Sequence, residues 1–150
     1  MPSKTTKKPA IAHFKDFIVL VTGVIIKPRN EILVVRRSTS SKTFPDFWQL
    51  PEGKIEFGEQ PLETFKREIT EELGCKPSRP KIVHALSLIY PFAGKKFHLL
   101  RIIITSKLIG KITLSSEHNE YKWIKLKDLG RIKNLVPGTK ELVKSLPAIP

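Results

Sequence analysis

The chain has 150 residues, enough for one domain with one hydrophobic core, and its 40% hydrophobic and 27% charged residues are typical of a folded globular protein. No apolar run reaches the roughly eighteen residues that a membrane span needs, no secretory signal is evident, and the single cysteine predicts a cytoplasmic protein without an intrachain disulfide. The net charge of +13 favours anionic partners, either nucleotides or RNA, although no RNA-binding motif accompanies the lysines.

The N-terminal third is predicted to form strands. Residues 17–26 are rich in β-branched and apolar side chains, and a turn at 27–31 leads into a second strand at 32–35. Residues 36–46 are polar and contain a proline, which is typical of a loop. A short strand is expected at 47–50.

A helix is predicted from Gln60 to Leu73, after a loop from Gly53 to Glu59. Pro61 falls in the first turn of this helix, where proline is tolerated, and Gly74 stands where a helix commonly ends. The helix is therefore bounded at both ends by the residues that helices favour there.

The remaining residues alternate between strand and helix patterns. Strands are expected at 81–90, 97–107 and 121–124, a helical turn at 126–132, and a closing helix at 139–146. Residues 1–13 are expected to be a flexible basic arm and residues 14–150 a single domain. This order predicts an α/β fold in which helices cover both faces of a mixed sheet.

An acidic segment stands out against the basic chain. Seven of the fourteen acidic residues lie between Glu52 and Glu72, a segment with a net charge of −4 in a chain whose remainder carries +17. Glu68, Glu71 and Glu72 have the spacing that brings side chains to one face of a helix. Carboxylates this close repel one another unless a cation binds, and their oxygen ligands favour Mg²⁺ or Mn²⁺ over zinc. A merely solvated acidic helix is the alternative interpretation.

Residues beside these glutamates support a metal site. Gly53 would let the backbone of the preceding loop pass close to the metal. Arg67 cannot be a ligand, and we expect it to pair with Glu59 and fix the loop on the helix.

The segment from Gly53 to Cys75 resembles the signature of the Nudix hydrolases. That signature is Gly, five residues, Glu, seven residues, Arg-Glu, an aliphatic residue, any residue, Glu-Glu, any residue, Gly and a further aliphatic residue. The chain supplies it in register with Gly53, Glu59, Arg67, Glu68, Ile69, Glu71, Glu72 and Gly74, and Cys75 takes the last apolar position. Weaker similarity extends over roughly residues 17–130.

The resemblance implies a Nudix-type α/β/α sandwich that hydrolyses a diphosphate linkage with Mg²⁺ or Mn²⁺. It assigns metal binding to Glu68, Glu71, Glu72, the backbone at Gly53 and, from a later loop, Glu117, with Glu120 as a second choice. It assigns catalysis to Glu68, Glu71 and Arg67 without deciding which glutamate is the base, and phosphate binding to Arg36 or Arg37. Glu52 replaces the first of two glycines usual in the family, and is expected to bind substrate or add a ligand.

Several other residues have two interpretations. His118 is expected to be structural or solvent-facing, and Cys75 to be inert packing. Phe44, Tyr90 and Phe92 are each placed where they would stack on a base or, as aromatic residues at strand ends more often do, pack in the core.

Three functions fit the sequence. The first is MutT-like hydrolysis of nucleoside triphosphates, including oxidised ones such as 8-oxo-dGTP. The second is cleavage of ADP-ribose, dinucleoside polyphosphates or RNA 5′ ends. The third is a nucleotide sensor without catalysis, against which the intact set of glutamates argues.

Overall fold

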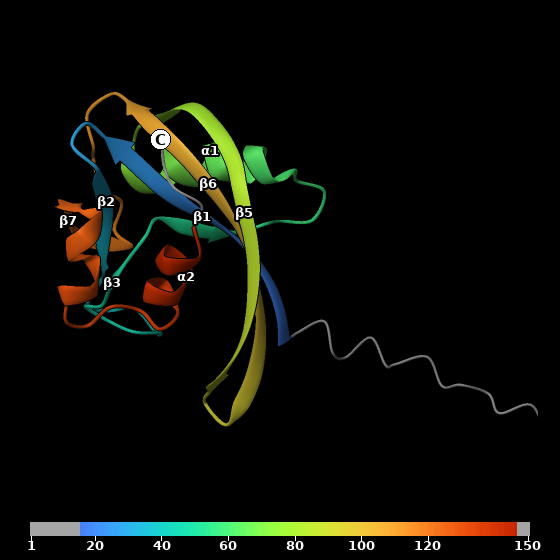
Figure 1. The fold of residues 1–150 in the computed structure, drawn as a ribbon. Helices are drawn as coiled ribbons and strands as arrows, with labels where there is room; N and C mark the ends of the chain where they lie inside the picture. Colours follow the sequence, from blue (N-terminus) through green and yellow to red (C-terminus); the bar gives the residue numbers. More distant parts are fainter. Residues whose placement is uncertain (1–15, 147–150) are drawn as a thin grey trace, which may run out of the picture.

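The computed structural model describes residues 16–146 and consists of a split, mixed β-sheet between two helical layers (Figure 1). The basic arm expected at residues 1–13 lies outside the described residues. The elements in chain order are β1 (Phe17–Lys27), β2 (Glu31–Arg37), β3 (Trp48–Gln49), β4 (Glu52–Lys54), α1 (Pro61–Leu73), β5 (Lys76–Phe92), β6 (Lys95–Ile109), β7 (His118–Lys125), the 3₁₀-helix η2 (Leu126–Arg131) and α2 (Thr139–Ser145).

The sheet has the strand order β3-β2-β1-β6-β5, with β1 and β6 parallel and the other pairs antiparallel. β1 and β2 are paired only at their turn, at Ile26 with Ile32 and Lys27 with Glu31. Beyond this point the two strands diverge, so that β1 pairs with β4 and β2 pairs with β3 and β7. The divergence opens the middle of the sheet on the side where the acidic helix begins.

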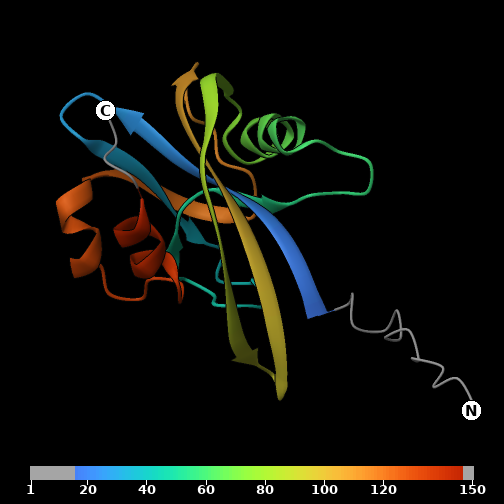
Figure 2. The same ribbon diagram turned by 45° about the vertical axis from the view of Figure 1, so that its right-hand side comes forward.

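Two hydrophobic clusters fill the two faces of the sheet. On one face Phe65, Ile69 and Leu73 of α1 pack against β1, β2 and β6, and on the other Leu129 and Leu142 from η2 and α2 cover the sheet (Figure 2). Neighbouring strand residues serve opposite clusters because side chains alternate across a sheet. The expected α/β sandwich with helices on both faces is confirmed.

The helix α1 begins and ends as expected. Pro61 is its first residue, Glu63 accepts a hydrogen bond from the backbone N–H of Gln60 at 3.0 Å, and Gly74 ends it in the left-handed conformation with φ of 63°. Its cap N–H donates to the carbonyl of Thr70 at 3.0 Å. The helix is thereby fixed at both ends, and its charged face is held in a constant orientation towards β4.

Three strand boundaries differ from the predictions. β5 begins at Lys76 rather than at residue 81, because it is an edge strand that accommodates Pro77 and Pro80 with irregular pairing. Residues 52–54, expected mostly as loop, pair with β1 as β4, and β7 begins at His118 rather than at residue 121. None of the described helices is long and apolar enough to cross a membrane.

Candidate active site

The strand β4 brings the backbone into contact with the acidic face of α1. A Cβ atom added at Gly53 would lie 2.1 Å from Cδ and 2.4 Å from Oε1 of Glu68, well inside van der Waals contact. Only glycine leaves room for the Glu68 carboxyl group here. Gly58 in the same loop differs, since its φ is +86° and nothing lies within 4 Å of an added Cβ.

Arg67 holds the loop between β4 and α1 in place. Its guanidinium group donates two hydrogen bonds of 2.9 Å to the Glu59 carboxylate, one of 2.8 Å to Glu68 and one of 3.2 Å to the carbonyl of Lys54. The hydrogen bonds from Arg67 lower the pKa of Glu59 to about 2, and Glu59 in turn raises the pKa of Arg67. The pairing expected from sequence is thus present, with both partners charged.

The three helix glutamates do not share one environment. Glu68 and Glu72 line a cleft, whereas Glu71 lies outside its lining, with its side chain 60% exposed and 3.3 Å from Arg67. Burial raises the pKa of Glu72 and of Glu68, and the repulsion between the two carboxyl groups raises that of Glu72 further. Oε2 of Glu72 is buried without a hydrogen-bond partner among the described residues. Such a pair is costly to keep ionised unless a cation lies beside it.

The segment before β7 brings a third carboxylate to this pair. Ser115 donates a backbone hydrogen bond of 3.0 Å to the carbonyl of Glu72, which anchors the segment to the end of α1. Glu117 and His118 then reach the cleft, and one ligand atom from each lies within 4.8 Å of the other and of Glu72. Glu120 instead forms an ion pair with Arg36, at 3.1 Å.

His118 is presented to the cleft as a hydrogen-bond donor. Arg37 donates to Oε1 of Gln49 at 3.0 Å, which turns the Gln49 amide nitrogen towards Nε2 of His118, 3.3 Å away. Burial, with repulsion from Arg37, lowers the pKa of His118 to about 4, so the ring carries one proton. Because Nε2 accepts, that proton is on Nδ1, which is buried without a partner among the described residues. A protonated Nδ1 cannot ligate a metal, so the cluster is an oxygen site with a neighbouring N–H donor.

The two arginines predicted to meet phosphate have other contacts. Arg36 is not in the lining of the cleft and donates to Asn119 at 2.7 Å. Arg37 lines the cleft, but its guanidinium group makes three hydrogen bonds of 2.8 Å to Ser41 and Thr43 besides the one to Gln49. Arg37 therefore organises the loop beside the cleft as well as orienting Gln49.

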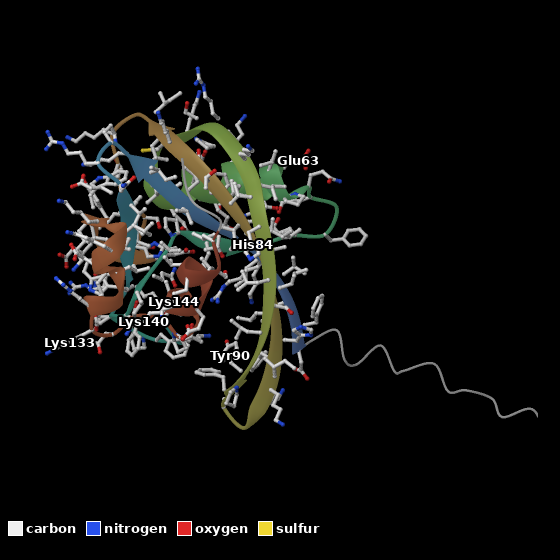
Figure 3. All side chains as sticks on the ribbon, in the orientation of Figure 1. Glu63, His84, Tyr90, Lys133, Lys140 and Lys144 are labelled. Atoms are coloured by element: carbon white, nitrogen blue, oxygen red, sulfur yellow. The ribbon has the colours of Figure 1, made fainter. Side chains whose placement is uncertain are left out.

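The cleft itself has a volume of about 1000 Å³ and two unlike ends. One end is the acidic cluster, and the other is lined by aromatic side chains from the β5–β6 hairpin and the loop after β2, namely Phe44, Tyr90, Phe92 and Phe97. Tyr90 lies towards the far end of the hairpin in Figure 3. A site of this size with an apolar end and convergent polar groups suits a small molecule.

Two residues at the floor of the cleft carry charge between these ends. Glu52, in the position where the family signature usually has glycine, accepts a hydrogen bond of 3.1 Å from Thr22. Arg101 of β6, only 4% exposed, has its Nε 3.4 Å from the same carboxylate oxygen. Arg101 was missed by the sequence analysis, although a single arginine in the apolar strand sequence LLRIII is a signal that a functional group faces inward.

The chain belongs to the Nudix hydrolase family. The family model described as the NUDIX domain matches residues 17–146. An 8-oxo-dGTP diphosphatase of Buchnera aphidicola is 36% identical over 110 residues, which cover 73% of this chain and 78% of that protein. An RNA pyrophosphohydrolase of Orientia tsutsugamushi (strain Boryong) is 29% identical over 138 residues, with 82% and 83% covered. The crystal structure of a MutT protein from Methanosarcina mazei Go1 superposes with a TM-score of 0.72 at 27% identity, covering 85% of this chain and 91% of that one.

Membership identifies the reaction class. The protein is a MutT-like Nudix hydrolase, an enzyme family that acts on nucleoside diphosphate linkages and generally uses a divalent metal. The acidic cluster described above is the group of residues in this chain with the chemistry for such a metal.

Proposed function

We propose that the protein hydrolyses nucleoside triphosphates, oxidised ones included, to a monophosphate and pyrophosphate at the cluster of Glu68, Glu72 and Glu117. The observation that carries the proposal is the buried carboxyl pair of Glu68 and Glu72, pressed against Gly53 at one end of a cleft large enough for a nucleotide. The 8-oxo-dGTP diphosphatase named among the relatives supports this substrate class.

The residues of the cluster fit a hard divalent cation. They offer carboxylate oxygens only, Oε2 of Glu72 is without a partner among the described residues, and Gly53 leaves the space at Glu68 that a Cβ would fill. We propose Mg²⁺ or Mn²⁺, held by Glu68, Glu72 and Glu117 with the backbone at Gly53. Glu71 would take an outer position or none, since it lies outside the cleft lining.

When bound, the metal would neutralise phosphoryl oxygens and lower the pKa of a water molecule. We propose that Glu68 accepts the proton from the attacking water, because its carboxyl group lies in the cleft and Arg67 fixes one of its oxygens at 2.8 Å. Arg67 and Glu59 are positioning residues in this scheme, because they hold the loop and Glu68 rather than the substrate. The Nδ1–H of His118 would donate to a phosphate oxygen beside Glu117.

A second candidate is removal of pyrophosphate from RNA 5′ ends, the activity named for the Orientia relative. A shallower groove of about 550 Å³ shares Val136 and Pro137 with the cleft and continues to Lys140 of α2. Lys133 and Lys144 lie on the same side of the molecule as Lys140 (Figure 3). This basic track would suit the chain that follows a 5′ nucleotide.

A hydrolysis screen separates these substrates. It compares unmodified and oxidised deoxynucleoside triphosphates, ADP-ribose, dinucleoside polyphosphates and 5′-triphosphorylated RNA, each with Mg²⁺, Mn²⁺ or EDTA. Glu72→Gln should abolish turnover, and Glu63→Gln is the matched control because Glu63 caps the same helix away from the cleft. Turnover that persists in EDTA or in Glu72→Gln would refute the proposed site. We propose the cytoplasm as the compartment, on the evidence of the single free, buried Cys75.

A further inference from the structure

The guanidinium group of Arg101 is buried with hydrogen bonds left unmade. Arg101 lines the cleft at 4% exposure, and among the described residues neither its Nε nor its Nη1 has a hydrogen-bond partner. Leaving a buried charged donor unsatisfied is costly, and proteins retain such groups where a ligand completes them. The cleft is the side from which an acceptor can reach this side chain.

Glu52 accompanies Arg101 and supplies the opposite hydrogen-bonding character. Its carboxylate lies 3.4 Å from Nε of Arg101 and accepts from the hydroxyl group of Thr22, which is itself buried. The Glu52 side chain is 15% exposed and lines the cleft. A donor group and an acceptor group thus stand side by side at the floor of the cleft.

The walls beside this pair suit a planar ring. Phe97 and Tyr90 have ring centroids 5.8 Å apart and an interplanar angle of 30°, and Phe44 and Phe92 form a second pair at 5.8 Å. All four side chains line the cleft, together with Leu99 and other apolar side chains. Aromatic walls stack on nucleobases of any identity, so they bind a base without selecting it.

We propose that Arg101 and Glu52 form the base-reading site, and that it selects a guanine-type base. Arg101 would donate to the O6 keto oxygen, and Glu52 would accept from N1–H and the N2 amino group next to it. Adenine offers a single amino donor beside a ring nitrogen and completes fewer of these bonds. Oxidation of guanine at C8 leaves this edge unchanged, so both forms fit. The inference names the base of the substrate class proposed above, and therefore rests on that function.

The test measures binding of reaction products, which the enzyme does not cut. Dissociation constants for GMP, IMP and AMP are measured with Mg²⁺ present by calorimetry, for the wild type, Arg101→Met and Glu52→Gln. We expect wild-type affinity in the order GMP, IMP, AMP, with GMP about ten- to hundredfold tighter than AMP, the range for bonds to charged groups. Arg101→Met should lose most of this preference by weakening GMP while leaving AMP within about twofold.

A matched control separates base reading from packing. Ser106 is buried in the same strand, donates to backbone carbonyls and does not line the cleft, so Ser106→Ala should lower the melting temperature but keep the GMP/AMP ratio. An unchanged ratio in Arg101→Met, or a wild-type preference for AMP, would overturn the inference. Selective GMP binding by a protein that hydrolyses no triphosphate would instead overturn the proposed function and leave the base-reading site standing.

Discussion

Replacing Gly53 by alanine tests the contact between β4 and the acidic helix. The added Cβ would lie 2.1 Å from Cδ of Glu68, so the carboxyl group must retreat by about 1.3 Å to reach the 3.4 Å of ordinary contact. A displacement of about 1 Å at a reacting centre costs on the order of 100-fold in rate, or about 2.7 kcal/mol of activation free energy. We therefore expect Gly53→Ala to lower kcat at least 100-fold.

The same substitution should have little effect on stability. The atoms that must move are the end of a flexible side chain rather than backbone, and Glu68 and Glu72 repel each other less when separated. We expect the free energy of unfolding to change by less than about 1 kcal/mol, measured by urea denaturation without metal.

Gly58→Ala provides the control with the opposite signature. Its φ of +86° disfavours alanine by about 1 kcal/mol or more, while no atom lies within 4 Å of the new Cβ. This variant should lose stability and keep its kcat. If Gly53→Ala instead retained wild-type kcat, or lost activity only because it unfolded, the close approach of β4 to Glu68 would not serve catalysis.

Three further outcomes follow from the site. Glu72→Gln should abolish turnover while Glu71→Gln, at an exposed position outside the cleft, lowers it far less; equal losses in kinetic assays would contradict this division. Without metal at pH 8, Glu72→Gln should also melt no lower than the wild type, because the raised pKa of Glu72 means that its ionisation destabilises the fold as pH rises. Glu59 has a folded pKa of about 2 against an ordinary 4.5, so its stabilising effect is present above pH 4.5 and lost as pH falls towards 2. Glu59→Gln should accordingly be less stable than the wild type in urea at pH 7, and a difference that persisted at pH 2 would argue against the ion pair. His118→Asn, which can keep a donor at the Nδ1 position, should retain more activity than His118→Gln, and the reverse order would show that the Nε2 side matters more.

The sequence was sufficient for the fold class and for the helix that carries the site. The helix prediction succeeded because Pro61 and Gly74 mark its ends and its apolar residues have helical spacing, all of which are local signals. Pairing between Arg67 and Glu59 was also expected, since opposite charges eight residues apart were joined by a loop and one helical turn or two.

Features that depend on distant segments were not predictable in the same way. The spacing of Glu71 matches that of its neighbours, yet the exposure of its side chain is decided by where β4 crosses the helix. Arg37 could be assigned to phosphate only while its hydrogen bonds to Ser41 and Thr43 were unknown. The pairing of Glu52 with Arg101 joins residues 49 positions apart through two strands that flank β1, which no local pattern encodes.

The measurement closest to the central claim is product analysis of dGTP hydrolysis by ³¹P NMR with Mg²⁺ present. The proposed chemistry predicts dGMP and pyrophosphate as the products, formed by the wild type and not by Glu72→Gln or in EDTA. Formation of dGDP and orthophosphate, or identical turnover by Glu72→Gln, would contradict the assignment of the reaction to the Glu68 and Glu72 pair.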